Sequence, residues 1–446
     1  MTGGRGGGTA RSMTITLVGN LFPPAAALAS GPILAQALGV DGRGAVAAAA
    51  APLGLAIALM TFGVPEAVSY TVARHPGLVR VAARNGAFIV VLTGLLATGA
   101  VLVARPWLSG GEPEIQHLMA VASVAVLPTL LLGVLRGIAS GLQRWTMVAW
   151  EKVLASALRL VVLLPLWLTG HLTPFTATVV LAMMPVLGAV AYLRLPRRLP
   201  AAQEDTEGVA STRTVTGYGL RLWFGTISGI LLSRVDQTLM TPLSSAYELG
   251  LYVVAVNVSE LPLVIHRAVR DVTFVTDAHR SEDGRLAAAA RISTLVCTVV
   301  ALGLGGTMWW WLPLLFGTEF AGAVPVAWLL LAAVVVSTPG SIAGAGLSAR
   351  GRPGQRSVAL VIACVLNIAA LVALVPVWGA MGAAVATVIG YVVSSLLNQV
   401  FLRRLSGVRL RTFYGVRWSD LRTLRDYLGR VLRAVRRVLP GRRVRS

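Results

Sequence analysis

The feature that most constrains this chain is the recurrence of apolar stretches about 18 to 25 residues long, separated by clusters of charge. A helix of that length crosses the hydrocarbon core of a bilayer, which is roughly 30 Å thick. Only 13% of the residues are charged, against roughly 25% in an average soluble domain. The sequence therefore predicts an all-α membrane protein with about twelve transmembrane helices. The apolar stretches are 13–38, 45–73, 85–104, 115–135, 153–168, 175–193, 217–241, 249–269, 287–313, 322–347, 358–376 and 381–402.

The basic residues are concentrated in alternate loops, and this alternation predicts the orientation. One set of loops holds most of the arginines, whereas the other set holds only Arg43 and Arg105. Arginine-rich loops stay in the cytoplasm. Because the number of spans is even, both termini are expected there. The net charge of +21 then reflects topology and anionic lipid rather than nucleic acid.

The longest polar interruption, residues 194–216, falls almost halfway along the chain. We expect it to be a cytoplasmic linker between two pseudo-symmetric lobes of six helices each, residues 13–193 and 217–402, around a central cavity. Residues 1–12 and 403–446 would form the cytoplasmic N-terminus and an Arg-rich cytoplasmic tail.

Weak internal symmetry favours this division. The segment that ends at Gly44 resembles the segment that ends at Gly250, and the pair Gly133 and Gly137 resembles Gly340 and Gly344. Internal repeats of this kind are common in membrane transport proteins.

The tail has a different pattern. In residues 418–439, apolar side chains such as Trp418, Leu421, Leu424 and Leu428 recur at helical spacing, and arginines fill the other positions. This pattern predicts a basic amphipathic helix that lies on the inner leaflet and binds anionic lipid. The alternative is a solvated charged tail. No stacking aromatic residues or motif indicate nucleic-acid binding.

Short motifs in register with these stretches resemble those of the bacterial oligosaccharide flippases. This family is the polysaccharide-export branch of the multidrug/oligosaccharidyl-lipid/polysaccharide exporter (MOP) superfamily. The likeness runs through most of residues 13–402, and the tail lies outside it. The residues that carry it are Leu38–Gly44, Gly63–Val68, Gly133–Arg144, Arg234–Asp236, Leu249–Ala255, Leu315–Phe320, Ala349–Arg352 and Pro376–Ala384.

The resemblance implies alternating access around a cavity in a bacterial plasma membrane. The substrate would be an undecaprenyl-diphosphate-linked oligosaccharide for cell-surface polysaccharide, and polysaccharide synthesis proteins would be possible partners. In the related lipid II flippases the first spans supply arginines to the cavity. Here the first span has only Asn20 and Gln36 as larger polar groups, which disfavours a peptidoglycan precursor.

Arginines inside the spans are the candidates for diphosphate binding, because a planar guanidinium can hold two phosphate oxygens. The candidates are Arg159, Arg234 and Arg267. Arg159 either meets phosphate in the cavity or extends to the inner interface. Arg291 lies near the inner surface, and we expect it to extend to the headgroups.

Carboxylates inside the spans are the candidates for coupling. Glu260 and Asp236 are proposed for proton or cation coupling, since intramembrane charges are functional candidates by default. Asp271 is expected to pair with Arg267 four residues earlier. Glu66 is expected to form a structural ion pair with Arg136 or Arg74.

Two other functions remain open. A cation-coupled drug antiporter of the same superfamily would concentrate carboxylates in its cavity, and a membrane-embedded polymerase or glycosyltransferase would need a larger outer loop. Cys297 and Cys364 lie inside apolar stretches and give no metal or redox motif. We therefore expect no catalytic residue, metal or cofactor. A non-transporting scaffold is the remaining possibility.

Overall fold

A computed structural model describes residues 5–195, 200, 208–279, 282–415, 417, 418 and 420. Within these residues every regular element is helical. The main helices are α1 (Arg5–Met60), α2 (Val64–Arg74), α3 (Val79–Leu108), α4 (Pro113–Ser123), α5 (Val126–Gly141), α6 (Trp145–Leu168), α7 (Pro174–Leu187), α8 (Thr212–Leu243), α9 (Ala246–His279), α10 (Asp283–Phe316), α11 (Ala323–Ala349) and α12 (Pro353–Ser406). Short 3-10 turns include η1 (Pro76–Leu78), η2 (Gly188–Tyr192), η4 (Thr318–Gly322) and η5 (Leu410–Phe413).

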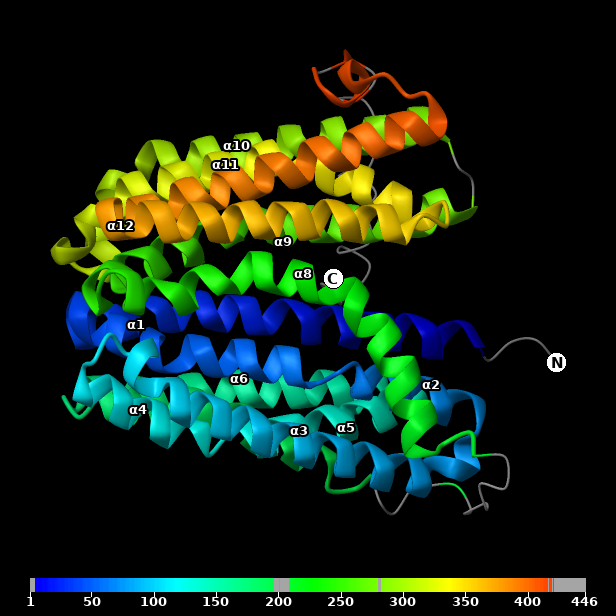
Figure 1. Cartoon of the computed structure of the whole chain (residues 1–446), viewed down its shortest axis with the longest axis horizontal. Helices are drawn as coiled ribbons and strands as arrows, with labels where there is room; N and C mark the ends of the chain where they lie inside the picture. Colours follow the sequence, from blue (N-terminus) through cyan, green and yellow to red (C-terminus); the bar gives the residue numbers. More distant parts are fainter. Residues whose placement is uncertain are drawn as a thin grey trace, which may run out of the picture. The chain divides into compact units, whose positions relative to one another are not determined.

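Two of these helices are each a pair of spans joined at one glycine. Gly39 in α1 has φ 65° and Gly379 in α12 has φ 52°, a backbone region that glycine adopts without steric cost. The chain reverses direction at each kink, as Figure 1 shows for α1 in dark blue and α12 in orange. The loop that the sequence predicts between residues 38 and 45 is therefore absent, because the helix resumes directly after Gly39.

The count of membrane helices agrees with the sequence. Eight of the described helical stretches are long and apolar enough to cross a membrane by length and composition alone. When α1 and α12 are divided at their kinks, and when α1 with α2 and α4 with α5 are joined across short breaks, the described helices form twelve spans. The prediction of an all-α, multi-pass membrane protein with about twelve spans is confirmed.

Local sequence signals explain where several helices begin. Proline occupies the first turn of α2, α4, α7 and α12, where its missing N–H costs no hydrogen bond and its φ suits a helix. Thr173 and Thr176 form a capping box at the start of α7. Pro65 therefore lies in the first turn of α2, which follows a break at Phe62 and Gly63, whose φ values are positive.

The chain divides into two compact units. Unit 1 comprises Met1–Val258, Thr307–Leu329 and Cys364–Thr387, and unit 2 comprises Ser259–Gly306, Leu330–Ala363 and Val388–Ser446. The division into lobes at residues 194–216 stays a prediction, because this partition follows compactness and divides α9 to α12 between the units.

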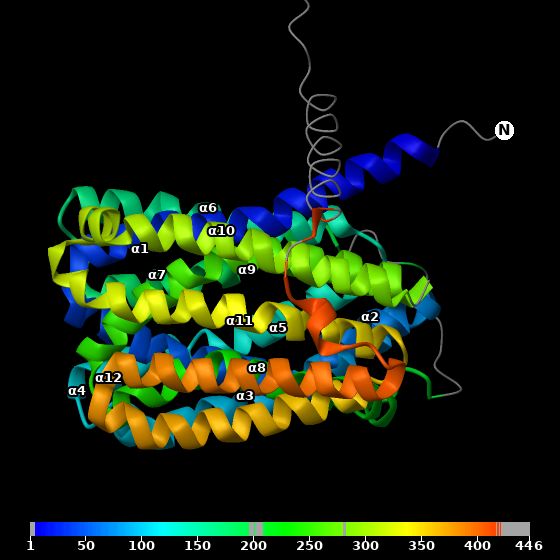
Figure 2. The same ribbon diagram turned by 90° about the horizontal axis from the view of Figure 1, so that it is seen from above.

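In unit 1, α1 packs along α6 (Figures 1 and 2). Close contacts between glycines also join α1 to the start of α9. A Cβ on Gly44 would lie 1.8 Å from the Ala246 carbonyl oxygen, and a Cβ on Gly250 would lie 2.3 Å from the Val40 carbonyl oxygen. Each glycine thus faces the carbonyl four residues before the other. This reciprocity is a local two-fold contact between the two segments whose sequences resemble each other.

A second reciprocal contact joins the break before α2 to α8. A Cβ on Gly63 would lie 2.3 Å from the Gly219 carbonyl oxygen, and a Cβ on Gly219 would lie 2.4 Å from the Phe62 carbonyl oxygen. Only glycine permits backbones to approach this closely.

Candidate functional site

Two arginines of unit 1 form the candidate site, Arg43, which is buried, and Arg159, which is half-buried. Arg43 lies in α1, about four residues beyond the Gly39 kink, and only 8% of its surface is exposed. The sequence placed Arg43 in an external loop, and this was wrong. Because the chain turns within one residue, Arg43 lies on a helix and packs inside the bundle.

Arg159 comes from α6 and points toward α1. Its Nη2 donates a hydrogen bond to the Ser30 hydroxyl oxygen, and the Ser30 hydroxyl in turn donates to the Ala27 carbonyl oxygen over 3.0 Å. Arg159 precedes the end of α6 at Leu168 by about nine residues, or about 13 Å of helix. The guanidinium therefore contacts α1 within the bundle, and its contact with a phosphate stays a prediction.

The two guanidinium groups lie close enough for mutual repulsion. The Nε atoms of both residues are buried without a hydrogen-bond partner, and no ion pair joins either residue to a carboxylate in the described part of the chain. An apolar cluster surrounds the neighbouring turns of α1, α6 and α7 and includes Leu34, Val46 and Leu163. Two interacting cations with unused donors in such surroundings can attract an anion.

The other arginines named from the sequence do not join this pair. Arg234 in α8 and Arg267 in α9 both have exposed side chains. Arg234 belongs to unit 1 and Arg267 to unit 2. Contact of either residue with a diphosphate stays a prediction.

Asp236, a proposed coupling residue, is buried in a hydrogen-bonded group. The Tyr252 hydroxyl donates to its Oδ2 over 2.6 Å, and the Gln237 backbone N–H donates to its Oδ1 over 2.7 Å. The Thr387 hydroxyl lies 3.0 Å from the Tyr252 hydroxyl. The exposed fraction of Asp236 is 5%, so this carboxyl group is sealed inside unit 1.

Two of the remaining carboxylates are more accessible than Asp236. Glu260 is half-buried in α9, and Glu66 is exposed in the first turn of α2. The side chain of Asp271 lies outside the described residues, so its pairing with Arg267 stays a prediction.

Arg136 forms a structural ion pair, but its partner differs from the predicted one. Its Nε and Nη2 donate to the two carboxylate oxygens of Glu151 over 2.9 and 2.6 Å. The Tyr192 hydroxyl donates to the same carboxylate over 2.9 Å. Glu66 was named as the partner, but Glu151 in the second turn of α6 faces the end of α5, whereas Glu66 points outward.

Arg291 is also buried rather than extended to the headgroups. In unit 2, its Nε and Nη2 donate to both carboxylate oxygens of Asp420 over 2.6 and 2.8 Å, and its Nη1 donates to the Thr412 carbonyl oxygen over 2.7 Å. The hydrogen bond from Arg291 lowers the pKa of Asp420. The sequence could not indicate this pair, because its members are far apart along the chain.

A second arginine of unit 2, at the helix ends, is paired as well. Arg350, directly after α11, donates to Asp277 over 2.8 Å and to Asp283 over 2.5 Å. The hydrogen bond to Asp277 raises the pKa of Arg350. Arg350 therefore stays cationic in all ordinary buffers.

Known proteins resemble this chain in both sequence and fold. Residues 9–274, more than half of the chain, match the model of the polysaccharide biosynthesis protein family. The chain belongs to this family. The resemblance seen in the sequence motifs is confirmed, and no curated protein sequence gave a match.

Solved structures show that this polysaccharide biosynthesis family member has the MOP transporter fold. An inward-facing multidrug resistance MATE transporter aligns with TM-score 0.68 at 17% identity and covers 88% of this chain and 98% of that chain. The lipid II flippase MurJ, in an inward closed conformation, aligns with TM-score 0.68 at 12% identity, and the alignment covers 90% of this chain and 89% of MurJ. A MOP superfamily transporter from Pyrococcus furiosus aligns with TM-score 0.55 at 14% identity, with 91% and 96% covered.

Proposed function

We propose that this protein flips a polyprenyl-diphosphate-linked oligosaccharide across a bacterial plasma membrane by alternating access, for cell-surface polysaccharide. Both termini would be cytoplasmic, and the lobes would be residues 13–193 and 217–402. The observation that carries the proposal is the pair of Arg43 and Arg159, whose Nε atoms are both buried without a hydrogen-bond partner among the described residues. The family supports a role in polysaccharide biosynthesis, and the fold supports transport.

A diphosphate suits this pair for a physical reason. A charge in a membrane costs up to roughly 2.5–3.5 kcal/mol on insertion scales, with the largest cost at the centre, and a second like charge nearby adds repulsion. A bound diphosphate would remove both costs and occupy the free donors. Ser30, which accepts from Arg159, would hold that side chain in place before the substrate arrives.

The main rival is a cation-coupled drug antiporter of the same superfamily. The fold does not separate the two, since the MATE transporter and MurJ align with the same TM-score of 0.68. The charge of the site favours the flippase, because two arginines without a carboxylate partner in the described residues repel a cationic drug and attract a phosphate. A membrane-embedded polymerase or glycosyltransferase remains the other alternative, and no observation here favours it.

Coupling is proposed to involve Asp236, with Glu260 as the second candidate. The Asp236 carboxyl group is buried and held by Tyr252. Binding of a proton or a small cation would neutralise it and change the hydrogen bonds that join α8, α9 and α12. Such a group can link an ion gradient to a movement of these helices.

The experiment compares Arg43→Gln and Arg159→Gln in a strain that lacks the chromosomal gene. Each variant should flip substrate about 10- to 100-fold more slowly, because a hydrogen bond to a charged group contributes about 1.5–3 kcal/mol. Undecaprenyl-linked sugar should then accumulate on the inner leaflet. The matched control is Arg105→Gln, at the far end of α3, which should retain the wild-type rate.

Two results would contradict the proposal. One is wild-type polysaccharide with both variants at normal expression. The other is an unchanged pool of lipid-linked sugar when the gene is deleted.

A further inference from the structure

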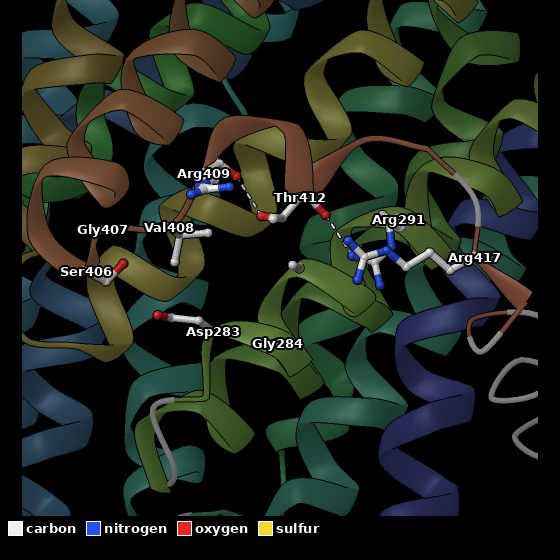
Figure 3. A pocket seen from close by; sticks show the side chains of 10 residues that line it. Asp283, Gly284, Arg291, Ser406, Gly407, Val408, Arg409, Thr412 and Arg417 are labelled. Carbon is white, nitrogen blue, oxygen red and sulfur yellow. Dashed lines mark hydrogen bonds between the residues drawn. The ribbon is translucent and has the colours of Figure 1, made fainter.

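A polar cavity in unit 2 lies where the chain leaves the last helix. Its volume is about 260 Å³, and it is lined by the first turns of α10 and by the segment after α12 (Figure 3). The arginines that line it are Arg291, Arg409 and Arg417, and Asp283 is the acidic lining residue. We propose that this cavity binds a phosphate-bearing anion, with Arg409 and Arg417 as the cations that hold it.

The ion pairs around the cavity determine which charges remain for a ligand. Arg291 is paired with Asp420, and Asp283 is paired with Arg350, which also pairs with Asp277. Arg409 and Arg417 are exposed and form no ion pair with a described residue. The Arg417 side chain extends toward that of Arg291 at one end of the cavity (Figure 3). The cavity therefore has a net positive charge.

The cavity wall formed by α10 also favours an anion. Asp283 and Gly284 begin this helix, and a helix N-terminus has a partial positive charge. A Cβ on Gly284 would meet no atom within 4 Å, so this wall leaves space beside the helix start. The volume is below the roughly 300–1,000 Å³ typical of drug-sized ligands, which suits a headgroup.

The surrounding side chains place the cavity at the depth of lipid headgroups. Trp418 is 82% exposed and Tyr414 is 49% exposed, and both lie within a few residues of Arg417. Exposed Trp and Tyr side chains concentrate at the membrane–water interface. A phospholipid phosphate would reach the two arginines from there, and soluble phosphate would use the same contacts from water.

The test uses the full-length protein in detergent. Short-chain phosphatidylglycerol, short-chain phosphatidylcholine and inorganic phosphate are titrated separately, and retained ligand is measured by native mass spectrometry. Wild type should retain one phosphatidylglycerol in preference to phosphatidylcholine, whose choline would be repelled. The double variant Arg409→Gln/Arg417→Gln should bind phosphatidylglycerol at least about tenfold more weakly, because two charge-assisted contacts are lost.

Two further variants make the result specific. Arg411→Gln removes an exposed arginine of the same segment that does not line the cavity, and it should bind like wild type. Gly284→Leu fills the space without removing a charge, and it should also lose the lipid. If excess inorganic phosphate displaces the lipid, phosphate alone suffices; if not, the site requires the whole headgroup. Equal binding of phosphatidylglycerol by wild type, the double variant and Gly284→Leu would overturn the proposal.

Discussion

Replacing Arg43 by methionine should stabilise the protein while stopping transport. Methionine retains an unbranched apolar side chain and removes a guanidinium that is 8% exposed and has no carboxylate partner in the described residues. A charge at the membrane centre costs roughly 2.5–3.5 kcal/mol. Arg43 lies only about four residues, or about 6 Å, from the Gly39 end of its helix. The cost there is smaller, so we expect a gain of about 1–2 kcal/mol in the free energy of unfolding.

The contrasting substitution is Arg136→Met. It removes the bidentate pair with Glu151, whose side chain is 3% exposed, and leaves that carboxylate with the Tyr192 hydroxyl as its remaining donor of the three. Breaking a buried pair on one side costs about 3–5 kcal/mol, and the Tyr192 bond places the expected loss near the lower value.

Equilibrium unfolding in mixed micelles, followed by tryptophan fluorescence, measures both effects on the same scale. Arg43→Met should shift the unfolding midpoint to higher denaturant and Arg136→Met to lower denaturant, while transport is lost in Arg43→Met. If Arg43→Met destabilises the protein as much as Arg136→Met does, Arg43 has a structural partner and the anion-site reasoning is refuted.

Three further predictions concern other contacts. The pair of Asp420 with Arg291 holds the segment after α12 against α10, and it lowers the pKa of Asp420. The pair therefore contributes its full stability above the ordinary aspartate pKa of about 3.8. This stability is lost as the pH falls through the lower folded-state pKa. Protease cleavage of the tail should thus stay constant from pH 7 to about 5 and increase only in stronger acid; an increase already near pH 6 would show that Asp420 does not hold the tail. Tyr252→Phe removes the hydroxyl that donates to Asp236 and should lower stability by about 1–3 kcal/mol and alter the pH dependence of transport, and an unchanged pH profile would separate Asp236 from coupling. Gly44→Ala should block transport, because its Cβ cannot lie 1.8 Å from the Ala246 carbonyl oxygen; normal transport would show that this contact is dispensable.

The membrane spans could be predicted because they depend on local properties. Length and apolarity alone define a helix that crosses a bilayer, and most of the predicted stretches fall within observed helices, whereas 45–73 and 115–135 each cross a short break. Even the glycine pattern carried information, since Gly44 and Gly250 were matched by sequence and pack against each other. Local composition is sufficient for such features.

The site could be predicted only in part, because partners depend on tertiary structure. Arg159 was identified since it stands inside an apolar stretch, whereas Arg43 was assigned to a loop beside Asp41. A turn made by the single residue Gly39 gives no loop signal in the sequence. Glu151 and Asp420 were missed as ion-pair partners because the local sequence does not indicate which arginine each carboxylate contacts.

The position of the arginine pair relative to the glycine contacts bears on how a substrate would leave. Arg43 is the direct neighbour of Gly44, and Gly44 contacts the start of α9 at the predicted outer end. On the proposed function, substrate enters past the contact between Gly63 and Gly219 and leaves when the contact between Gly44 and Gly250 separates.

Arg43 and Arg159 lie on α1 and α6, which pack together, so both arginines stay on one side of the outer contact when it opens. Release therefore cannot depend on separating the two cations. It would follow from water, which enters when Gly44 leaves Gly250 and raises the local dielectric constant. The attraction between guanidinium and phosphate falls several-fold when the effective dielectric constant rises from about 20 near protein to about 80 in water. The same two arginines can thus hold the diphosphate while the outer contact is closed and release it once the contact opens.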